Sequence, residues 1–187
     1  QDTSNGTEGM IKKFFEKIIQ TKNNDVKVIA EMSGNHQGTY EGASKFVKQA
    51  IKMGADAIKF QVYRAETITL NSNKKDFLVR SKGIWGKFKT LHDLYDEAHT
   101  PWKWISRLAS SLNTKEFPWF ASPFDISSVD FLEKLNCQAY KIASPEITDI
   151  PLIEKIALTR KPIILSTGLA TLKDIDLAVK TIKKKHK

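Results

Sequence analysis

The chain has 187 residues, of which 41% are hydrophobic and 27% charged, a composition typical of a soluble globular protein with one sizeable core. The net charge is +9, but no nucleic-acid motif and no apolar run of about 20 residues occurs, so we expect neither a nucleic-acid nor a membrane partner. The single cysteine, Cys137, excludes an internal disulfide and favours a reduced, cytoplasmic setting.

Residues 1–25 are predicted to form an N-terminal extension that precedes the folded domain, 26–187. The first ten residues are polar, lack the hydrophobic stretch of a signal peptide and contain no methionine before Met10. They are typical of an expression remnant or a truncated start, and we expect the extension to be partly disordered.

Five short apolar runs predict β-strands, at residues 26–32, 57–63, 119–124, 139–144 and 162–167. Apolar residues at helical spacing fill the gaps between them, at 39–54, 100–112, 127–136, 149–160 and 171–184. Alternation of strand and helix predicts a parallel sheet with crossover helices. Two architectures fit this pattern, a five-stranded doubly wound sheet and the first five units of an eightfold barrel, and periodicity does not separate them.

The connection from residue 64 to residue 100 is long for a strand-to-helix loop. Its aromatic and leucine side chains argue against disorder, so we expect a structured lid over the carboxyl ends of the strands. Thr100 is predicted to cap the helix that follows, with Pro101 in its first turn. Either Asp125 or Ser127 is expected to cap the next one.

Polar side chains gather at the carboxyl end of every predicted strand, where both architectures bind ligands. They are Glu31, Asn35 and His36; Lys59 and Gln61; Ser122; Lys141, Ser144 and Glu146; and Ser166, Thr167 and Gly168.

Lys59 and Lys141 need explanation because an unpaired ammonium is costly inside an apolar strand. Together with the hydroxyls they suit a phosphate or carboxylate ligand, although pairing with a buried glutamate explains each lysine alone equally well. The Ser-Thr-Gly stretch at 166–168 precedes a predicted helix and offers backbone N–H groups and the helix dipole. Glu31 and Glu146 suit sugar hydroxyls or proton transfer.

The segments "VIAEMSGNH", "GADAIKFQVY", "FASPFD", "LNCQAYKIASPEITDIPLI" and "KPIILSTGLATLKDI" resemble the sialic acid synthase family, the N-acetylneuraminate synthase-like enzymes. Within it, "LYDEAHTPWKW" and "SPFD" are most similar to the pseudaminic acid synthase branch. The resemblance runs from about Val26 to Lys184. It implies a TIM-type (β/α)8 barrel, of which this chain supplies about five β/α units, without the family's C-terminal antifreeze-like domain.

The resemblance implies condensation of phosphoenolpyruvate with an open-chain N-acetylated amino hexose, giving a nine-carbon nonulosonic acid of the pseudaminic type and phosphate. An N-acetylneuraminate or legionaminate synthase is the alternative within the family. A truncated, non-catalytic anion-binding module and an unrelated doubly wound phosphate-binding protein are alternatives from other classes.

Site residues follow from the resemblance by motif. Glu31 is expected to be catalytic, phosphoenolpyruvate to be held by Lys59, Ser122, Lys141, Ser144 and Ser166, and the sugar by Glu146, Gln61 and Asn35.

The resemblance also implies a divalent manganese or magnesium ion, held by histidines of strands six and seven, and a homodimer of the full-length enzyme. This sequence stops after the helix that follows the fifth strand, so those histidines are expected to lie beyond Lys187. His186 matches neither position, and we expect no metal ligand in this chain.

Five strands of an eightfold barrel leave open edges and an uncovered interior face. We therefore expect the chain to be a fragment of a longer protein and inactive alone.

Overall fold

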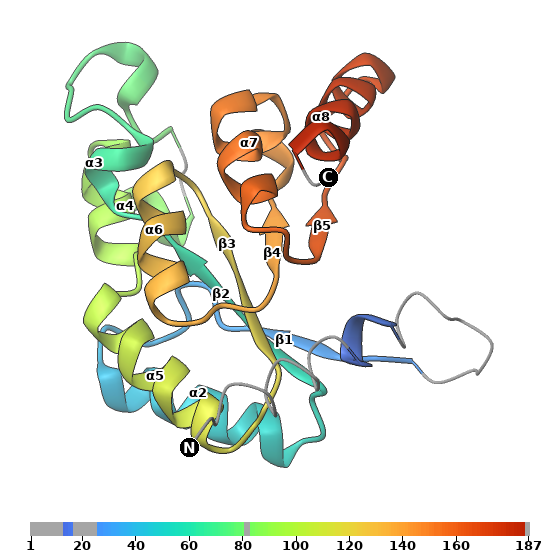
Figure 1. Ribbon diagram of the computed structural model, residues 1–187. Helices are drawn as coiled ribbons and strands as arrows, with labels where there is room; N and C mark the ends of the chain where they lie inside the picture. The colour runs from blue at the N-terminus through green and yellow to red at the C-terminus, as the bar shows by residue number, and fades with distance from the viewer. Residues whose placement is uncertain (1–12, 17–25, 81–82, 186–187) are drawn as a thin grey trace.

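The computed structural model describes residues 13–16, 26–80 and 83–185. Its five parallel strands lie side by side in the order in which they occur along the chain (Figure 1). They are β1 (Ile29–Glu31), β2 (Ala57–Val62), β3 (Trp119–Pro123), β4 (Tyr140–Ile142) and β5 (Ile163–Leu165). A doubly wound sheet reverses its strand order, whereas a barrel does not. The order therefore confirms a TIM-type barrel, represented by five β/α units.

Helices connect the strands as the periodicity predicts. They are α2 (Tyr40–Lys52), α5 (Trp102–Thr114), α6 (Ile126–Lys134), α7 (Ile150–Leu158) and α8 (Leu172–Lys185). Their apolar side chains form one core with the outward-facing strand residues, among them Phe60, Trp119 and Tyr140. Within the described ranges, no helix combines the length and the apolar character that a membrane crossing demands.

Local contacts explain where the helices begin and end. Gly54 adopts φ +90°, a conformation that glycine tolerates, and stands just beyond the end of α2. Asp125, one of the two predicted caps, accepts a hydrogen bond from the Ser128 N–H at the start of α6. The prediction for α5 is wrong, because Pro101 holds the cap position and the Thr100 hydroxyl donates instead to the Ser33 carbonyl oxygen.

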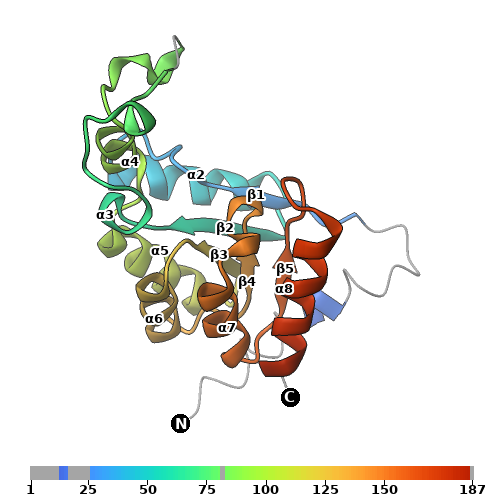
Figure 2. The ribbon, with the colours of Figure 1, turned by 90° about the horizontal axis from the view of Figure 1, so that it is seen from above.

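The described parts of the segment of residues 64–100, which are 64–80 and 83–100, are structured, as predicted. They contain α3 (Ala65–Ile68), η1 (Lys75–Phe77), η2 (Ile84–Lys87) and α4 (Leu91–Ala98). Figures 1 and 2 show it standing beside the end of β2, away from β4 and β5. Tyr63, at the base of the segment, packs edge-on against Tyr95 and Phe124 with ring centroids 6.0 and 5.5 Å apart. The segment therefore flanks the strand ends and does not cover all of them.

The interior face of the sheet has an apolar layer at the amino ends of the strands and a polar layer at their carboxyl ends. Each interior apolar residue stands two positions before a polar one, in the pairs Ile29 and Glu31, Ala57 and Lys59, Phe120 and Ser122, Ala139 and Lys141, and Ile164 and Ser166. Successive residues of a strand point to opposite faces, so both members of each pair share the interior.

Phe14 and Phe15 cover the apolar layer, a feature that the expected bare interior face did not include. They are 7% and 6% exposed and pack with Ala57, Phe120 and Ala139. The Phe15 ring meets the Phe120 ring edge-on at 5.7 Å.

Both ends of the sequence lie outside the described residues. Residues 1–10, His186 and Lys187 belong to these parts, so the expectations that concern them are untested. The domain boundary at residue 26, the absence of a metal ligand at His186 and the position of the family's histidines beyond Lys187 stay predictions.

Candidate functional site

The register of the first two strands brings the first acid and the first lysine of the site together. Glu31 of β1 lies opposite Lys59 of β2, and the two side chains form an ion pair. Phe60 and Val62 pack outward against the helices, so Lys59 and Gln61 face the interior. The pairing with glutamate that we considered for a strand lysine therefore occurs at Lys59.

Lys141 of β4 lies on the same interior face and belongs to the same charged cluster. Burial lowers its pKa, and the ammonium group of Lys59 lowers it further. The carboxylates of Glu31 and Glu146 act in the opposite direction. Two lysines and two glutamates from four segments of the chain thus share one electrostatic environment.

Three buried oxygen atoms in this cluster have no hydrogen-bond partner among the described residues. They are Glu31 Oε1, Ser122 Oγ and Glu146 Oε2. A buried polar atom without a partner costs about 1–3 kcal/mol, so native proteins seldom leave several together unless water or a ligand completes the site. Ser122 is only 1% exposed and lies next to Gln61 in the register of β2 and β3.

Glu146 stands in η3 (Ser144–Thr148), directly after β4. Burial raises the pKa of its carboxyl group, the nearby Asp149 adds to this effect, and Lys141 opposes it. The ionised form of Glu146 is therefore disfavoured until a hydrogen-bond donor or a positive charge joins it.

Ser144 and Ser166 stand at the ends of β4 and β5. The Ser144 hydroxyl accepts a hydrogen bond of 2.7 Å from the Leu169 N–H, and the Ser166 N–H donates to the Ile142 carbonyl oxygen at 3.1 Å. These contacts hold the turn after β5 against the end of β4.

The helix predicted at 171–184 is confirmed as α8 (Leu172–Lys185), and residues 166–168 precede it in the chain. The helix begins at Leu172, and Thr171 and Asp174 cap each other there. Its first N–H groups are therefore partly occupied by its own side chains.

The loop after β1 contains the remaining predicted residues. Asn35 is exposed, and its N–H donates to the Met32 carbonyl oxygen at 3.0 Å. His36 is buried, with Nδ1 accepting from the Gly38 N–H at 3.1 Å and Nε2 lying 3.2 Å from the Ala98 carbonyl oxygen. Both ring nitrogens of His36 therefore contact backbone groups.

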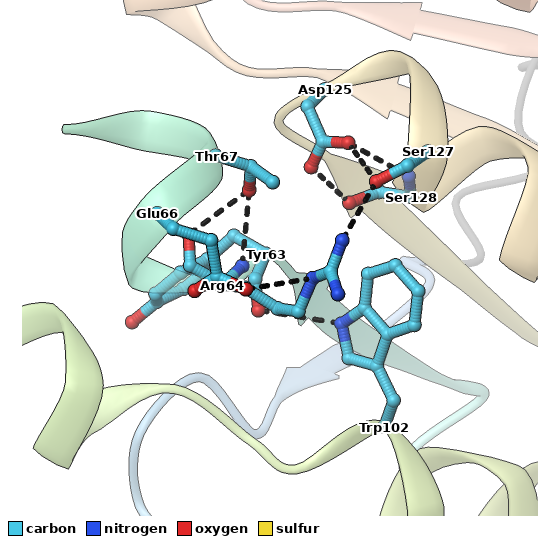
Figure 3. A network of polar contacts seen from close by, with 8 residues as sticks. All are labelled: Tyr63, Arg64, Glu66, Thr67, Trp102, Asp125, Ser127 and Ser128. Carbon is cyan, nitrogen blue, oxygen red and sulfur yellow. Dashed lines mark hydrogen bonds and ion pairs between the residues drawn. The ribbon is translucent and has the colours of Figure 1, made fainter. Parts of the chain in front are cut away.

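Sequence reasoning missed a polar network at the ends of β2 and β3, centred on Arg64 (Figure 3). Its guanidinium group lies 4.6 Å from the ring centre of Trp102 and donates to the Ser127 hydroxyl at 3.4 Å. Burial raises the pKa of Asp125, but hydrogen bonds from Ser127 and Ser128 outweigh it and hold this pKa below the ordinary value. The sequence did carry a signal for this network. Arg64 directly follows the second predicted strand, and the Asp-Ile-Ser-Ser stretch at 125–128 directly follows the third.

The divalent metal implied by the resemblance does not fit the residues that the structure describes. Among them, no group of three or more histidine, cysteine, aspartate or glutamate side chains is arranged to hold a metal ion. The histidines that the resemblance assigns to the metal are expected beyond Lys187, and nothing in this structure tests that expectation. No chemical step is therefore assigned to a metal here.

Comparison with known proteins gives one family and a consistent set of relatives. The sequence profile of the NeuB family matches residues 46–187. A pseudaminic acid synthase of Campylobacter jejuni is 46% identical over 151 residues, which are 80% of this chain and 43% of that protein. An N,N'-diacetyllegionaminic acid synthase of Legionella pneumophila is 34% identical over 161 residues, 83% of this chain and 43% of that protein. The chain thus spans less than half the length of these relatives.

A solved structure agrees with the fold. The N-acetylneuraminic acid (sialic acid) synthetase of Leptospira borgpetersenii, in complex with citrate, superposes with a TM-score of 0.69 and 31% sequence identity. The match covers 87% of this chain and 51% of that one. Five strand–helix units therefore correspond to about half of that protein.

Proposed function

The chain belongs to the NeuB family, and from that premise we propose that it forms the phosphoenolpyruvate-binding part of a nonulosonic acid synthase of the pseudaminic acid type. The observation that carries the proposal is the convergence of Lys59 and Lys141 on one interior face, beside the unpartnered hydroxyl of Ser122.

Phosphoenolpyruvate matches the charge of this cluster. It is a small molecule with a phosphate and a carboxylate, and both groups form their strongest hydrogen bonds with charged donors. Lys141 faces burial and a second ammonium group, a combination that an incoming anion relieves. The Ser122 hydroxyl is placed to donate to the same anion. Citrate, which the Leptospira relative holds, is likewise a small polyanion.

The proposed reaction joins phosphoenolpyruvate to the aldehyde of an open-chain N-acetylated hexose. C3 of phosphoenolpyruvate bonds to the aldehyde carbon, the aldehyde oxygen takes a proton, water adds at C2, and the C2–O bond to phosphate breaks. Glu31 has one oxygen paired with Lys59 and leaves Oε1 for a proton of the reaction. Glu146 and Gln61 are proposed to contact the sugar, whereas the exposed Asn35 is the weaker candidate.

The substrate assignment follows the degree of identity, 46% to the pseudaminic acid synthase against 34% to the legionaminic acid synthase. A legionaminate or neuraminate substrate is the alternative, and competition between the corresponding amino sugars in a phosphate-release assay separates them. Because the chain spans 43% of the length of these relatives, we propose that the isolated chain binds phosphoenolpyruvate but does not catalyse the reaction.

Calorimetric titration of the chain with phosphoenolpyruvate tests the proposal. Lys141→Ala should weaken binding roughly 10- to 100-fold, because a hydrogen bond to a charged group contributes about 1.5–3 kcal/mol. Lys180→Ala is the matched control, since Lys180 is exposed on α8 and pairs with Asp176. Equal affinity of the Lys141 and Lys180 variants would remove the anion site from the proposal.

A further inference from the structure

We propose that Ser33 is a positioning residue that holds the amide of Gln61 in one orientation and couples it to the segment of residues 64–100. The inference relies on the proposed function for the ligand that Gln61 would face, but the coupling itself is a property of this chain and is tested without a ligand.

The first observation is the contact between the two side chains. The Ser33 hydroxyl donates a hydrogen bond of 2.9 Å to Gln61 Oε1. With its acceptor oxygen engaged, Gln61 keeps its two amide N–H donors for a ligand. Such an amide suits an oxygen atom of the substrate, either a sugar hydroxyl or a carbonyl.

The second observation is the backbone of Ser33, which adopts φ +48°. A non-glycine residue in this left-handed region is strained, so surrounding contacts must hold it there. One of them is the hydrogen bond from the Asn35 N–H to the Met32 carbonyl oxygen, which closes the turn around Ser33. The strained residue lies two positions after Glu31.

The third observation is that the end of α4 rests on the same turn. The Thr100 hydroxyl donates to the Ser33 carbonyl oxygen at 3.3 Å, and Nε2 of His36 lies 3.2 Å from the Ala98 carbonyl oxygen. Gly34 packs so closely that an added Cβ would lie 3.1 Å from that same Ala98 oxygen. Ser33 therefore contacts the flanking segment through its backbone and the site through its side chain.

The test uses the side-chain amide signals of Gln61 in 15N-resolved NMR spectra, assigned by their loss in Gln61→Glu. Ser33→Gly removes the hydroxyl and relieves the backbone, whereas Ser33→Ala removes the hydroxyl and keeps the strain. Both variants should move the Gln61 signals by the same amount, toward those of the exposed Gln49. A purely structural role of Ser33 would instead give different effects for the two variants.

Gly34→Ala tests the coupling to the 64–100 segment, since its added methyl group presses on Ala98 and not on Gln61. It should shift the Gln61 signals as well. Gly54→Ala is the control, because it strains a φ of +90° at the end of α2 without meeting any atom within 4 Å. Unchanged Gln61 signals in Ser33→Gly or in Gly34→Ala would overturn the proposal. Phosphoenolpyruvate binding, measured separately, reports on the proposed function.

Discussion

Replacement of Phe15 by alanine tests whether the aromatic pair at residues 14 and 15 stabilises the five-stranded sheet. Phe15 is 6% exposed and its ring packs edge-on against Phe120. Truncation of a core phenylalanine to alanine costs about 3–5 kcal/mol. We take about 3 kcal/mol, the lower end, because Phe14 remains in place and covers part of the same layer.

Urea denaturation followed by circular dichroism measures this loss as a lower midpoint. Met53→Ala is the matched control, because Met53 is 83% exposed and its truncation should change the free energy of unfolding by less than about 0.5 kcal/mol. If the Phe15 and Met53 variants unfold at the same urea concentration, the pair contributes nothing and the reasoning fails. Loss of stability together with self-association on size exclusion would agree with exposure of the interior layer.

Three further predictions concern titratable groups. Glu146→Gln should raise the free energy of unfolding at pH 7, because the raised pKa of Glu146 means that folding disfavours its charged form. This gain should vanish below pH 4.5, where the carboxyl group of the wild type is protonated as well. Urea melts at the two pH values measure the gain, and an equal gain at both would contradict the prediction. Phosphoenolpyruvate affinity should fall as pH rises through the lowered pKa of Lys141, and a flat titration profile up to the ordinary lysine pKa of 10.5 would speak against it. Cys137, whose pKa burial raises to about 12, should resist a thiol reagent at pH 8 until urea unfolds the chain, so rapid native labelling would refute its burial.

The five strands and the charged residues on them were predictable because both signals are local. A parallel strand covered on both faces needs a nearly continuous apolar run, and Lys59 and Lys141 stand out against such runs. The order of the strands was not predictable from periodicity, because a doubly wound sheet and a barrel use the same strand–helix alternation. The family resemblance decided for the barrel, and the sequential order confirms it.

The features that sequence reasoning missed depend on partners that are distant in the chain. Thr100 resembles a helix cap locally, but its hydroxyl goes to Ser33, 67 residues away. Phe14 and Phe15 give no local sign that they meet Phe120. Likewise, nothing in the order of residues around Ser33 specifies a positive φ.

The separation of the barrel interior into an apolar layer and a polar layer has a consequence for engineering. Stabilising replacements often reduce activity when they touch strained or charged groups that function requires. Phe15 and Phe120 pack in the apolar layer through side chains that carry no polar group, whereas the ion pair of Lys59 with Glu31 belongs to the polar layer. Repacking the apolar layer is therefore a route to a more stable protein that keeps the charged residues of the proposed ligand site unchanged.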